Sequence, residues 1–496
     1  MVELDHYDAL NLETYRRIVS GGEPIVVDER LYEHVERRRE ALLRHLDTGV
    51  SAYGVTTGLG YLASETVGAE DQASLQHSLL TARASGLGPP LPRDVVRGAM
   101  LLRLVGFLSG FPGVSADLCR FLADRLNEGW SPRVPSGPFG ASGEIAPLAH
   151  LFQTFIGEGF VELDGERLPA REALTRCGVE AYEPGVKEGV ALLNGSPFAT
   201  ALGVRLGDLG GRLLEQASVA AALAVALVGA SARPFSARAV LLGAGTSEQK
   251  VAQRLLELLG AGALWEEKPQ PPVSFRVVPQ VHGVLARALE ELATTAERRL
   301  RSVTDSPVLL DVQTGEPEGL YPVGGFHAID ITRRLEGVAL AVAHVTNLVE
   351  KRLHRLLDAR FSGLPEQLAR RPGVQAGTVS LHKAVVGLVA ENRLLAAPAS
   401  IHAIDTSTGQ EDVQALTFLA AERLDAMLGN LEAALACELV ALRQAAHLRE
   451  GSFDAPLLAS VIARLAEIVA PIDEDRTLSP DVERVVALLR TGELVG

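Results

Sequence analysis

Cysteine is scarce in this chain of 496 residues, which contains only Cys119, Cys177 and Cys437. These positions are too far apart for a CxxC metal motif and too few for a disulfide framework, so we expect a reducing, cytoplasmic environment. Aromatic residues are also few, at 5% of the chain, whereas apolar residues reach 47% and are dominated by Ala and Leu. This balance favours helices over strands.

Basic residues are also fewer than acidic residues. There are 47 Lys and Arg against 62 Asp and Glu, a net charge of −15. Nucleic-acid binding draws on clustered Lys and Arg, so we expect no nucleic-acid partner. The longest uncharged apolar run, 217–230, is too short to cross a bilayer, and the first twenty residues contain no apolar core of a secretory signal. We therefore expect no membrane partner.

Long helical patterns are abundant in the middle of the chain. Apolar residues recur at i, i+3, i+4 and i+7 over 201–230, 333–360, 380–397 and 412–446. These helices are apolar around most of their circumference and need neighbours on every side. We predict a mainly α fold, a long central helical bundle with a smaller, loop-rich N-terminal domain, and a bundle that continues across subunits of a homo-oligomer.

The chain length is sufficient for about three regions at roughly 150 residues each. We expect an N-terminal domain over 1–200, a central bundle over 201–450 and a helical tail over 451–496. The N-terminal domain would carry a glycine-rich tyrosine loop and an Ala-Ser-Gly loop. Pro, Gly and Ser are so frequent over 130–147 that we expect no regular element there.

The triplet Ala141-Ser142-Gly143 is the most informative stretch. Gly143 has no side chain, so its nitrogen can approach the Ala141 carbonyl unusually closely. Attack on that carbonyl and loss of two waters would give a five-membered ring with a methylene carbon derived from Ser142, an electrophile made by the protein itself. On composition alone the same triplet can equally be an ordinary turn or helix cap.

The surrounding run, GPFGASGEIAPLAH at 137–150, resembles the signature of the aromatic amino acid ammonia-lyase and aminomutase family. In that family the triplet forms 4-methylideneimidazole-5-one (MIO). The resemblance extends along nearly the whole chain and is nearest to the histidine-specific branch. It implies a mostly helical homotetramer whose sites are completed by neighbouring subunits. The other motifs follow the family's order: YGVTTGLG at 53–60, LQHSLLTARASGLG at 75–88, LLNGS at 192–196, SFRVVPQVHG at 274–283, SVTDSP at 302–307, GGFHA at 324–328 and TSTGQED at 406–412.

The resemblance also implies catalytic roles. Ser142 would supply the methylene carbon, and Tyr53 would take a proton from the substrate β-carbon. Arg276 would bind the substrate carboxylate, for which a planar guanidinium is suited, and Asn194 would hydrogen-bond the cofactor or the amine. Glu411 matches the glutamate of the histidine-specific branch. Each side chain also has a purely structural alternative: a surface tyrosine, an ion pair or a satisfied loop amide.

The substrate-binding positions depart from the family. Histidine lyases typically read Ser-His where this chain has Ala82-Arg83, and a permanent cation there suits an acceptor or anionic group on the substrate. Val273 replaces a tyrosine usual in the family and can neither donate nor titrate. Phe326 would shield the ring from water or be a plain core residue. The full set implied for substrate binding is Gly60, Ala82, Arg83, Val273, Phe326 and Gln410.

These features predict a carbon–nitrogen lyase that removes ammonia from an aromatic or histidine-like α-amino acid, a small-molecule substrate. An aminomutase of the same family, a lyase for an atypical side chain that meets Arg83, and an inactive relative are the alternatives. The histidines singled out by the motifs are too scattered for HxxxH metal spacing, so no metal is expected.

Overall fold

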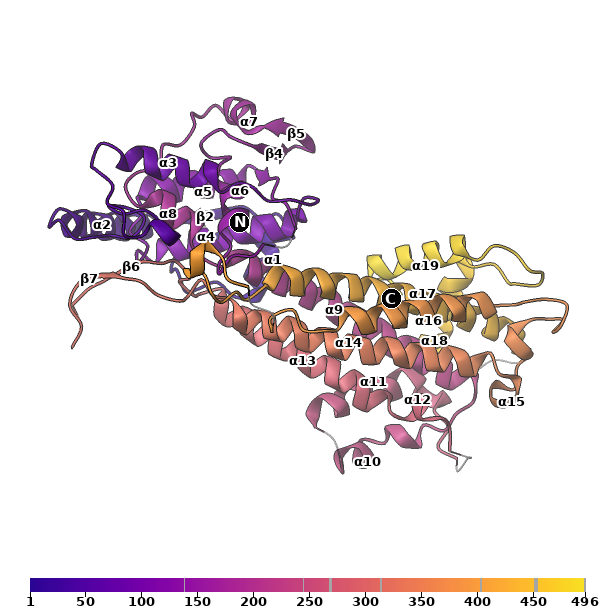
Figure 1. The fold of residues 1–496 in the computed structure, drawn as a ribbon. Coiled ribbons are helices and arrows are strands. Elements are labelled where there is room, and N and C mark those ends of the chain that lie inside the picture. The colour runs from indigo at the N-terminus through magenta and orange to yellow at the C-terminus, as the bar shows by residue number, and fades with distance from the viewer. Residues whose placement is uncertain are drawn as a thin grey trace. The chain divides into compact units, whose positions relative to one another are not determined.

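The computed structural model describes residues 1–137, 139–243, 245–266, 270–312, 315–401, 404–449 and 454–494 (Figure 1). The fold is mainly helical with a long helical bundle, which confirms the predicted fold class. Two compact units are present, and each draws on separate stretches of the chain. The first is Met1–Arg205, Ala293–Arg333 and Pro398–Ala421; the second is Leu206–Leu292, Arg334–Ala397 and Glu422–Gly496. The ranges predicted from the sequence, 1–200, 201–450 and 451–496, are continuous and stay a prediction.

The first unit combines short helices with small sheets. Its core is helix α4, Arg93–Leu108, whose residues from Val95 onward are all buried. The strands form a parallel pair β1-β2, an antiparallel sheet β3-β4-β5 and an antiparallel pair β6-β7. The elements are β1 (Val2–Leu4), α1 (Leu12–Val19), β2 (Ile25–Val27), α2 (Glu29–Leu46), η1 (Gly60–Leu62), α3 (Gln72–Ala82), α5 (Ala116–Asn127), β3 (Ser131–Pro132), α6 (Ile145–Phe152), β4 (Phe160–Leu163), β5 (Glu166–Pro169), α7 (Ala170–Arg176), α8 (Glu188–Leu193), β6 (Val308–Leu310), β7 (Gly319–Tyr321) and η5 (Ser407–Gly409).

The second unit is helical and holds most of each long helix. Side-chain bonds join its helices: the Asn392 amide donates to Thr346 Oγ1 at 3.1 Å and to the Met427 carbonyl at 3.5 Å. Among the described residues, no helix is both long enough and apolar enough to span a bilayer. The elements are α9 (Pro197–Leu227), η2 (Arg233–Phe235), α10 (Ala237–Leu241), α11 (Thr246–Leu259), η3 (Gly260–Gly262), α12 (Val273–Arg276), α13 (Val278–Arg299), α14 (Ile329–Leu356), α15 (Ala359–Ser362), η4 (Glu366–Leu368), α16 (Val379–Leu395), α17 (Thr417–Leu448), α18 (Pro456–Ile468) and α19 (Ser479–Thr491).

The long helices occur where the apolar periodicity predicts them, but their ends differ. Helix α9 begins at Pro197, because proline fits the first helical position, where no N–H is needed. Helix α17 begins at Thr417 rather than 412, because Leu416 has a φ of 49°, which no right-handed helix accommodates. The expectation of no regular element over 130–147 was wrong in part, since β3 lies there and α6 begins at Ile145.

A buried ion pair joins α14 to α17 within the bundle. Arg352 donates from Nε to Glu438 Oε1 at 2.9 Å and from a terminal nitrogen to Oε2 at 2.8 Å. Both side chains are almost fully excluded from solvent. Burial raises the pKa of Glu438, and the guanidinium acts in the opposite direction. The two-pronged geometry therefore compensates for the desolvation of both charges.

Replacing Arg352 by Met should destabilise the protein by about 3–5 kcal/mol, because Glu438 would be left buried without its partner. The double variant Arg352→Met, Glu438→Leu should recover most of that loss, since no uncompensated charge remains. Chemical denaturation followed by circular dichroism measures both. Equal losses in the single and double variants would show that the pair contributes through packing rather than charge.

Candidate active site

The loop carrying Tyr53 is shaped by its glycines. Gly54 and Gly60 have φ values of 68° and 58°, which side-chain-bearing residues rarely adopt. A Cβ atom at Gly54 would also lie 3.0 Å from Val190 Cγ2, so the loop packs closely against α8. The Gly60 N–H donates to the Tyr53 hydroxyl oxygen at 2.8 Å. A backbone donor aimed at the phenol oxygen stabilises negative charge there.

Tyr53 opens onto a cavity of about 290 Å³ whose charged and polar residues come from separate segments. Arg83, half-buried, caps the C-terminal end of α3, and Asn194 caps α8. Burial lowers the pKa of Arg83, while Tyr53 and Glu411 act to raise it. The cavity is thus lined by one cation, one carboxylate and two phenols, of which Tyr53 interacts electrostatically with Arg83. The remaining lining residues are Leu59, Gly60, Tyr61, Leu62, Ile145, Val190, Leu193 and Ser407.

Glu411 connects this cavity to the Ala-Ser-Gly loop. The Ser142 N–H donates to Glu411 Oε2 at 2.8 Å, and the Ser407 hydroxyl donates to Glu411 Oε1 at 2.9 Å. The Ser142 hydroxyl donates to the Val413 carbonyl at 2.8 Å. The backbone N–H and the hydroxyl of Ser142 are therefore both held by one short segment, 411–413, that follows η5.

Phe326 packs against the triplet on another side. A Cβ atom at Gly143 would lie 3.5 Å from Phe326 Cδ2 and 3.9 Å from the Gly195 carbonyl oxygen. A small cavity of about 20 Å³ lies here, lined by Phe326 and by residues 141–144 among others. The shielding position predicted for Phe326 is thus consistent with its contact on Gly143.

Asn194 is held in place by its own hydrogen bonds. Its side-chain amide donates to the Ser306 carbonyl at 2.5 Å, and its backbone N–H donates to the Val190 carbonyl at 3.0 Å. With the amide nitrogen anchored, the side chain has a fixed orientation at the cavity wall.

Glu144 anchors the loop directly after the triplet. Its buried carboxylate accepts hydrogen bonds from the Phe198 N–H at 2.7 Å and the Ala199 N–H at 2.6 Å, at the first turn of α9. The N-terminal N–H groups of a helix lack partners within the helix and favour an acceptor there. Burial raises the pKa of Glu144 to about 8, although the two N–H donors, Arg299 and Arg103 lower it.

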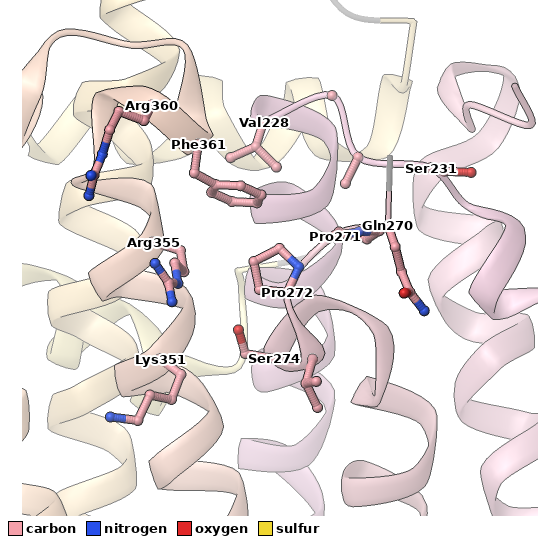
Figure 2. A pocket seen from close by; sticks show the side chains of 13 residues that line it. Val228, Ser231, Gln270, Pro271, Pro272, Ser274, Lys351, Arg355, Arg360 and Phe361 are labelled. Atoms are coloured by element: carbon pink, nitrogen blue, oxygen red, sulfur yellow. The ribbon is translucent and has the colours of Figure 1, made fainter. Parts of the chain in front are cut away.

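Several predicted residues lie elsewhere. Ala82 and Gln410 are exposed and do not line the cavity. Val273 and Arg276 lie on α12 in the second unit, where Arg276 Nε donates to the Pro271 carbonyl at 2.9 Å and Val273 is 58% exposed. Val273 borders a cavity of about 860 Å³. Figure 2 shows Lys351, Arg355 and Arg360 on one side of this cavity and Pro271 and Pro272 across from them.

Two contributors were missed by reasoning from the sequence. Ser407 lines the cavity and binds Glu411, and it lies in the TSTGQED motif, so the motif itself held the signal. Glu144 directly follows the triplet in the sequence, but the motif assigns it no role. Its partners, Phe198 and Ala199, are more than fifty residues away in the sequence, and no local sequence pattern predicts these contacts.

Comparisons with known proteins identify the family. The family model for aromatic amino acid lyases matches residues 10–467. The chain belongs to the aromatic amino acid lyase family. A histidine ammonia-lyase from Symbiobacterium thermophilum is 34% identical over 492 residues, covering 98% of this chain and 96% of the relative. Histidine ammonia-lyases are carbon–nitrogen lyases, and so is this chain.

Solved structures of the family share the fold. The histidine ammonia-lyase from Trypanosoma cruzi aligns with a TM-score of 0.88 at 25% identity, covering 100% of this chain and 94% of that one. The tyrosine aminomutase from Streptomyces globisporus aligns with a TM-score of 0.91 at 27% identity, covering 99% and 97%. Both structural alignments therefore cover at least 99% of this chain.

Glu144 should make stability depend on pH. Its pKa is raised by folding, so its contribution is complete below the ordinary carboxyl value and is lost as pH rises through about 8. Glu144→Gln stays neutral throughout. The melting temperature of the wild type should therefore fall relative to that of the variant between pH 5 and pH 8. A difference that stays constant across this range would contradict the assignment.

Proposed function

We propose that this chain is an ammonia-lyase for an aromatic or histidine-like α-amino acid, and that it works through MIO formed from Ala141, Ser142 and Gly143. One observation carries the proposal: Tyr53 and Glu411 line one cavity, and the same Glu411 carboxylate binds the Ser142 N–H. A base and the cofactor-forming triplet are thus linked through a single side chain.

The triplet suits the cofactor on structural grounds. Ala141, Ser142 and Gly143 lie outside any helix or strand, and the absent Cβ of Gly143 leaves room beside Phe326. Glu144 fixes the next residue to α9, so the chain on the C-terminal side of the triplet is held still. Once formed, the group supplies an electrophilic methylene carbon to which the substrate amine adds.

Tyr53 is the base that removes the β-proton. The Gly60 N–H and the Arg83 guanidinium both favour a negatively charged phenol oxygen. Asn194 contributes an amide at the same cavity wall, and the hydrophobic residues Leu59 and Leu193 limit access of water to the reacting atoms. Deprotonation of an unactivated β-carbon requires this combination of positioning and charge stabilisation.

We infer that Arg276 binds the substrate carboxylate. A planar guanidinium presents two parallel donors to a carboxylate, and the Pro271 carbonyl fixes its Nε. Assembly into a homotetramer in the cytoplasm, with the second unit forming the shared bundle, would supply this residue to the site.

Arg83 favours a second candidate within the same reaction type. The cation lies in the cavity with Tyr53 and Glu411, so an amino acid whose side chain carries an acceptor or an anion would pair with it. An aminomutase reaction is the further alternative, since a tyrosine aminomutase shares the fold. An assay for free ammonia separates lyase from aminomutase.

Replacing Ser142 by Ala should abolish ammonia release while leaving the fold intact, because alanine keeps the β-carbon but lacks the hydroxyl that must leave as water to give the methylene. Intact mass should read about 36 Da below the sequence value in the wild type, from loss of two waters, and match the sequence value in the variant. Ammonia release by Ser142→Ala would refute a mechanism through MIO, whereas a wild type of unreduced mass would indicate an inactive relative.

Replacing Arg83 by His should shift the substrate preference. The wild type should have its highest kcat/KM for side chains with acceptor or anionic groups. The kcat/KM of the variant for histidine should rise, because the fixed positive charge is removed. A panel of amino acids assayed for ammonia release gives kcat/KM for each. Ala82→Ser, at an exposed neighbour outside the cavity, is the matched control and should change the ranking by less than about threefold.

A further inference from the structure

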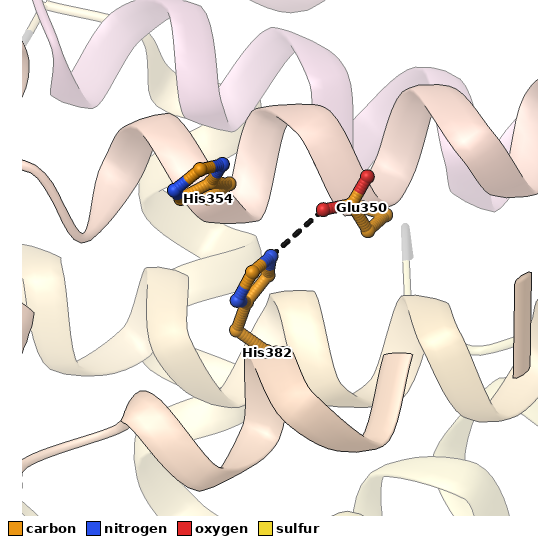
Figure 3. A group of neighbouring side chains, drawn as sticks. All are labelled: Glu350, His354 and His382. Carbon is orange, nitrogen blue, oxygen red and sulfur yellow. Dashed lines mark hydrogen bonds and ion pairs between the residues drawn. The ribbon is translucent and has the colours of Figure 1, made fainter. Parts of the chain in front are cut away.

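Three potential metal ligands meet on two helices of the second unit. Glu350 and His354 lie one turn apart on α14, and His382 projects from α16 toward them (Figure 3). Their candidate ligand atoms all lie within 4.8 Å of one another. His382 Nε2 lies 2.8 Å from Glu350 Oε1, and the two imidazole rings stack with centroids 4.7 Å apart. Small side-chain rotations would bring all three onto one ion.

Burial is graded across this cluster. Glu350 is buried, His382 is partly buried and His354 is exposed. An ion can therefore approach from solvent past His354 and reach a carboxylate shielded from water. A carboxylate in such a place binds a cation more strongly than an exposed one does, because less solvent screens the charge.

The charges around Glu350 leave one oxygen available. Lys351 Nζ binds Oε2 at 2.7 Å, so Oε1 is the oxygen that faces His382. Burial raises the pKa of Glu350, but the hydrogen bonds from Lys351 and His382 outweigh it and the pKa is lowered overall. Of the next cations along α14, Arg352 is paired with Glu438 and Arg355 lies 3.9 Å from Asp358. Lys351 is thus the main competing positive charge.

We propose that Glu350, His354 and His382 form a binding site for a divalent transition metal ion, Zn²⁺ by preference, that joins α14 to α16. Two imidazole nitrogens and one carboxylate oxygen are ligands that Zn²⁺ accepts in a tetrahedral site with water in the fourth position. Mg²⁺ and Ca²⁺ are disfavoured, since they prefer a shell of oxygens. The spacing Glu350 to His354 places both side chains on one helix face.

The ion would hold α14 and α16 together and would have a structural rather than a catalytic role. The segment 357–378 separates the two helices in the sequence, and a bond through the metal would restrain both ends of it. All three ligands belong to the second unit, whereas Tyr53 and Ser142 belong to the first. None of the three ligands is a residue assigned to the proposed ammonia-lyase reaction, so metal binding can be measured without that activity.

Metal binding can be tested on the intact, untagged protein after treatment with EDTA. Titration with Co²⁺ should produce visible d–d absorption that saturates at about one ion per chain, and Zn²⁺ should displace it. His382→Ala should weaken Co²⁺ binding more than about tenfold. His344→Ala, at an exposed histidine of α14 outside the cluster, is the matched control and should bind as the wild type does.

Two further readouts separate a real site from weak surface binding. Lys351→Gln should tighten Co²⁺ binding severalfold, because it removes the competing cation from Glu350. Zn²⁺ should raise the melting temperature of the wild type and of His344→Ala, but not that of His382→Ala. Absence of the Co²⁺ absorption, or equal affinities of His382→Ala and His344→Ala, would overturn the proposal.

Discussion

The contact between Glu144 and the first turn of α9 is the constraint on which the first unit's site depends. Two backbone N–H groups of a 31-residue helix bind one carboxylate at 2.6 and 2.7 Å. Because Glu144 is adjacent to Gly143, this contact fixes the end of the Ala-Ser-Gly loop against a rigid element. The opposite side of the triplet is held by Glu411 and Val413, so Ser142 has little freedom to reorient.

The two carboxylate oxygens of Glu411 bind different groups. One oxygen holds the Ser142 N–H, and the other accepts from Ser407 at the cavity wall. The same carboxylate offsets the desolvated Arg83, as does Tyr53. A cation, a phenol and a carboxylate therefore share a small volume in which each stabilises the charged form of another. Removing any one of them changes the electrostatics of the other two.

Much of the architecture was predictable from local pattern. The 3.6-residue periodicity predicts α9, α14, α16 and α17; α9, α14 and α17 are buried along most of their length, whereas α16 buries a single stripe, Leu381, Val385, Val389 and Asn392. Motif order predicts that Tyr53, Asn194 and Glu411 share a site, and they line one cavity. Contacts between distant segments were not predictable. The bond from Glu144 to α9 and the cluster of Glu350, His354 and His382 depend on tertiary packing, which single-sequence periodicity does not encode.

The departures from the family fall in different places from the retained chemistry. Three separate hydrogen bonds hold these groups in the first unit: the Gly60 N–H donates to Tyr53, the Ser142 N–H to Glu411 and the Phe198 N–H to Glu144. Arg83 and Val273, the two clearest substitutions, alter groups that face open space: Arg83 lines the cavity, and Val273 is largely exposed. A change at the exposed Val273 alters only the surface that α12 presents. Arg83 lies in one cavity with Tyr53 and Glu411, so a change there alters both the space in the cavity and the charge beside those two residues.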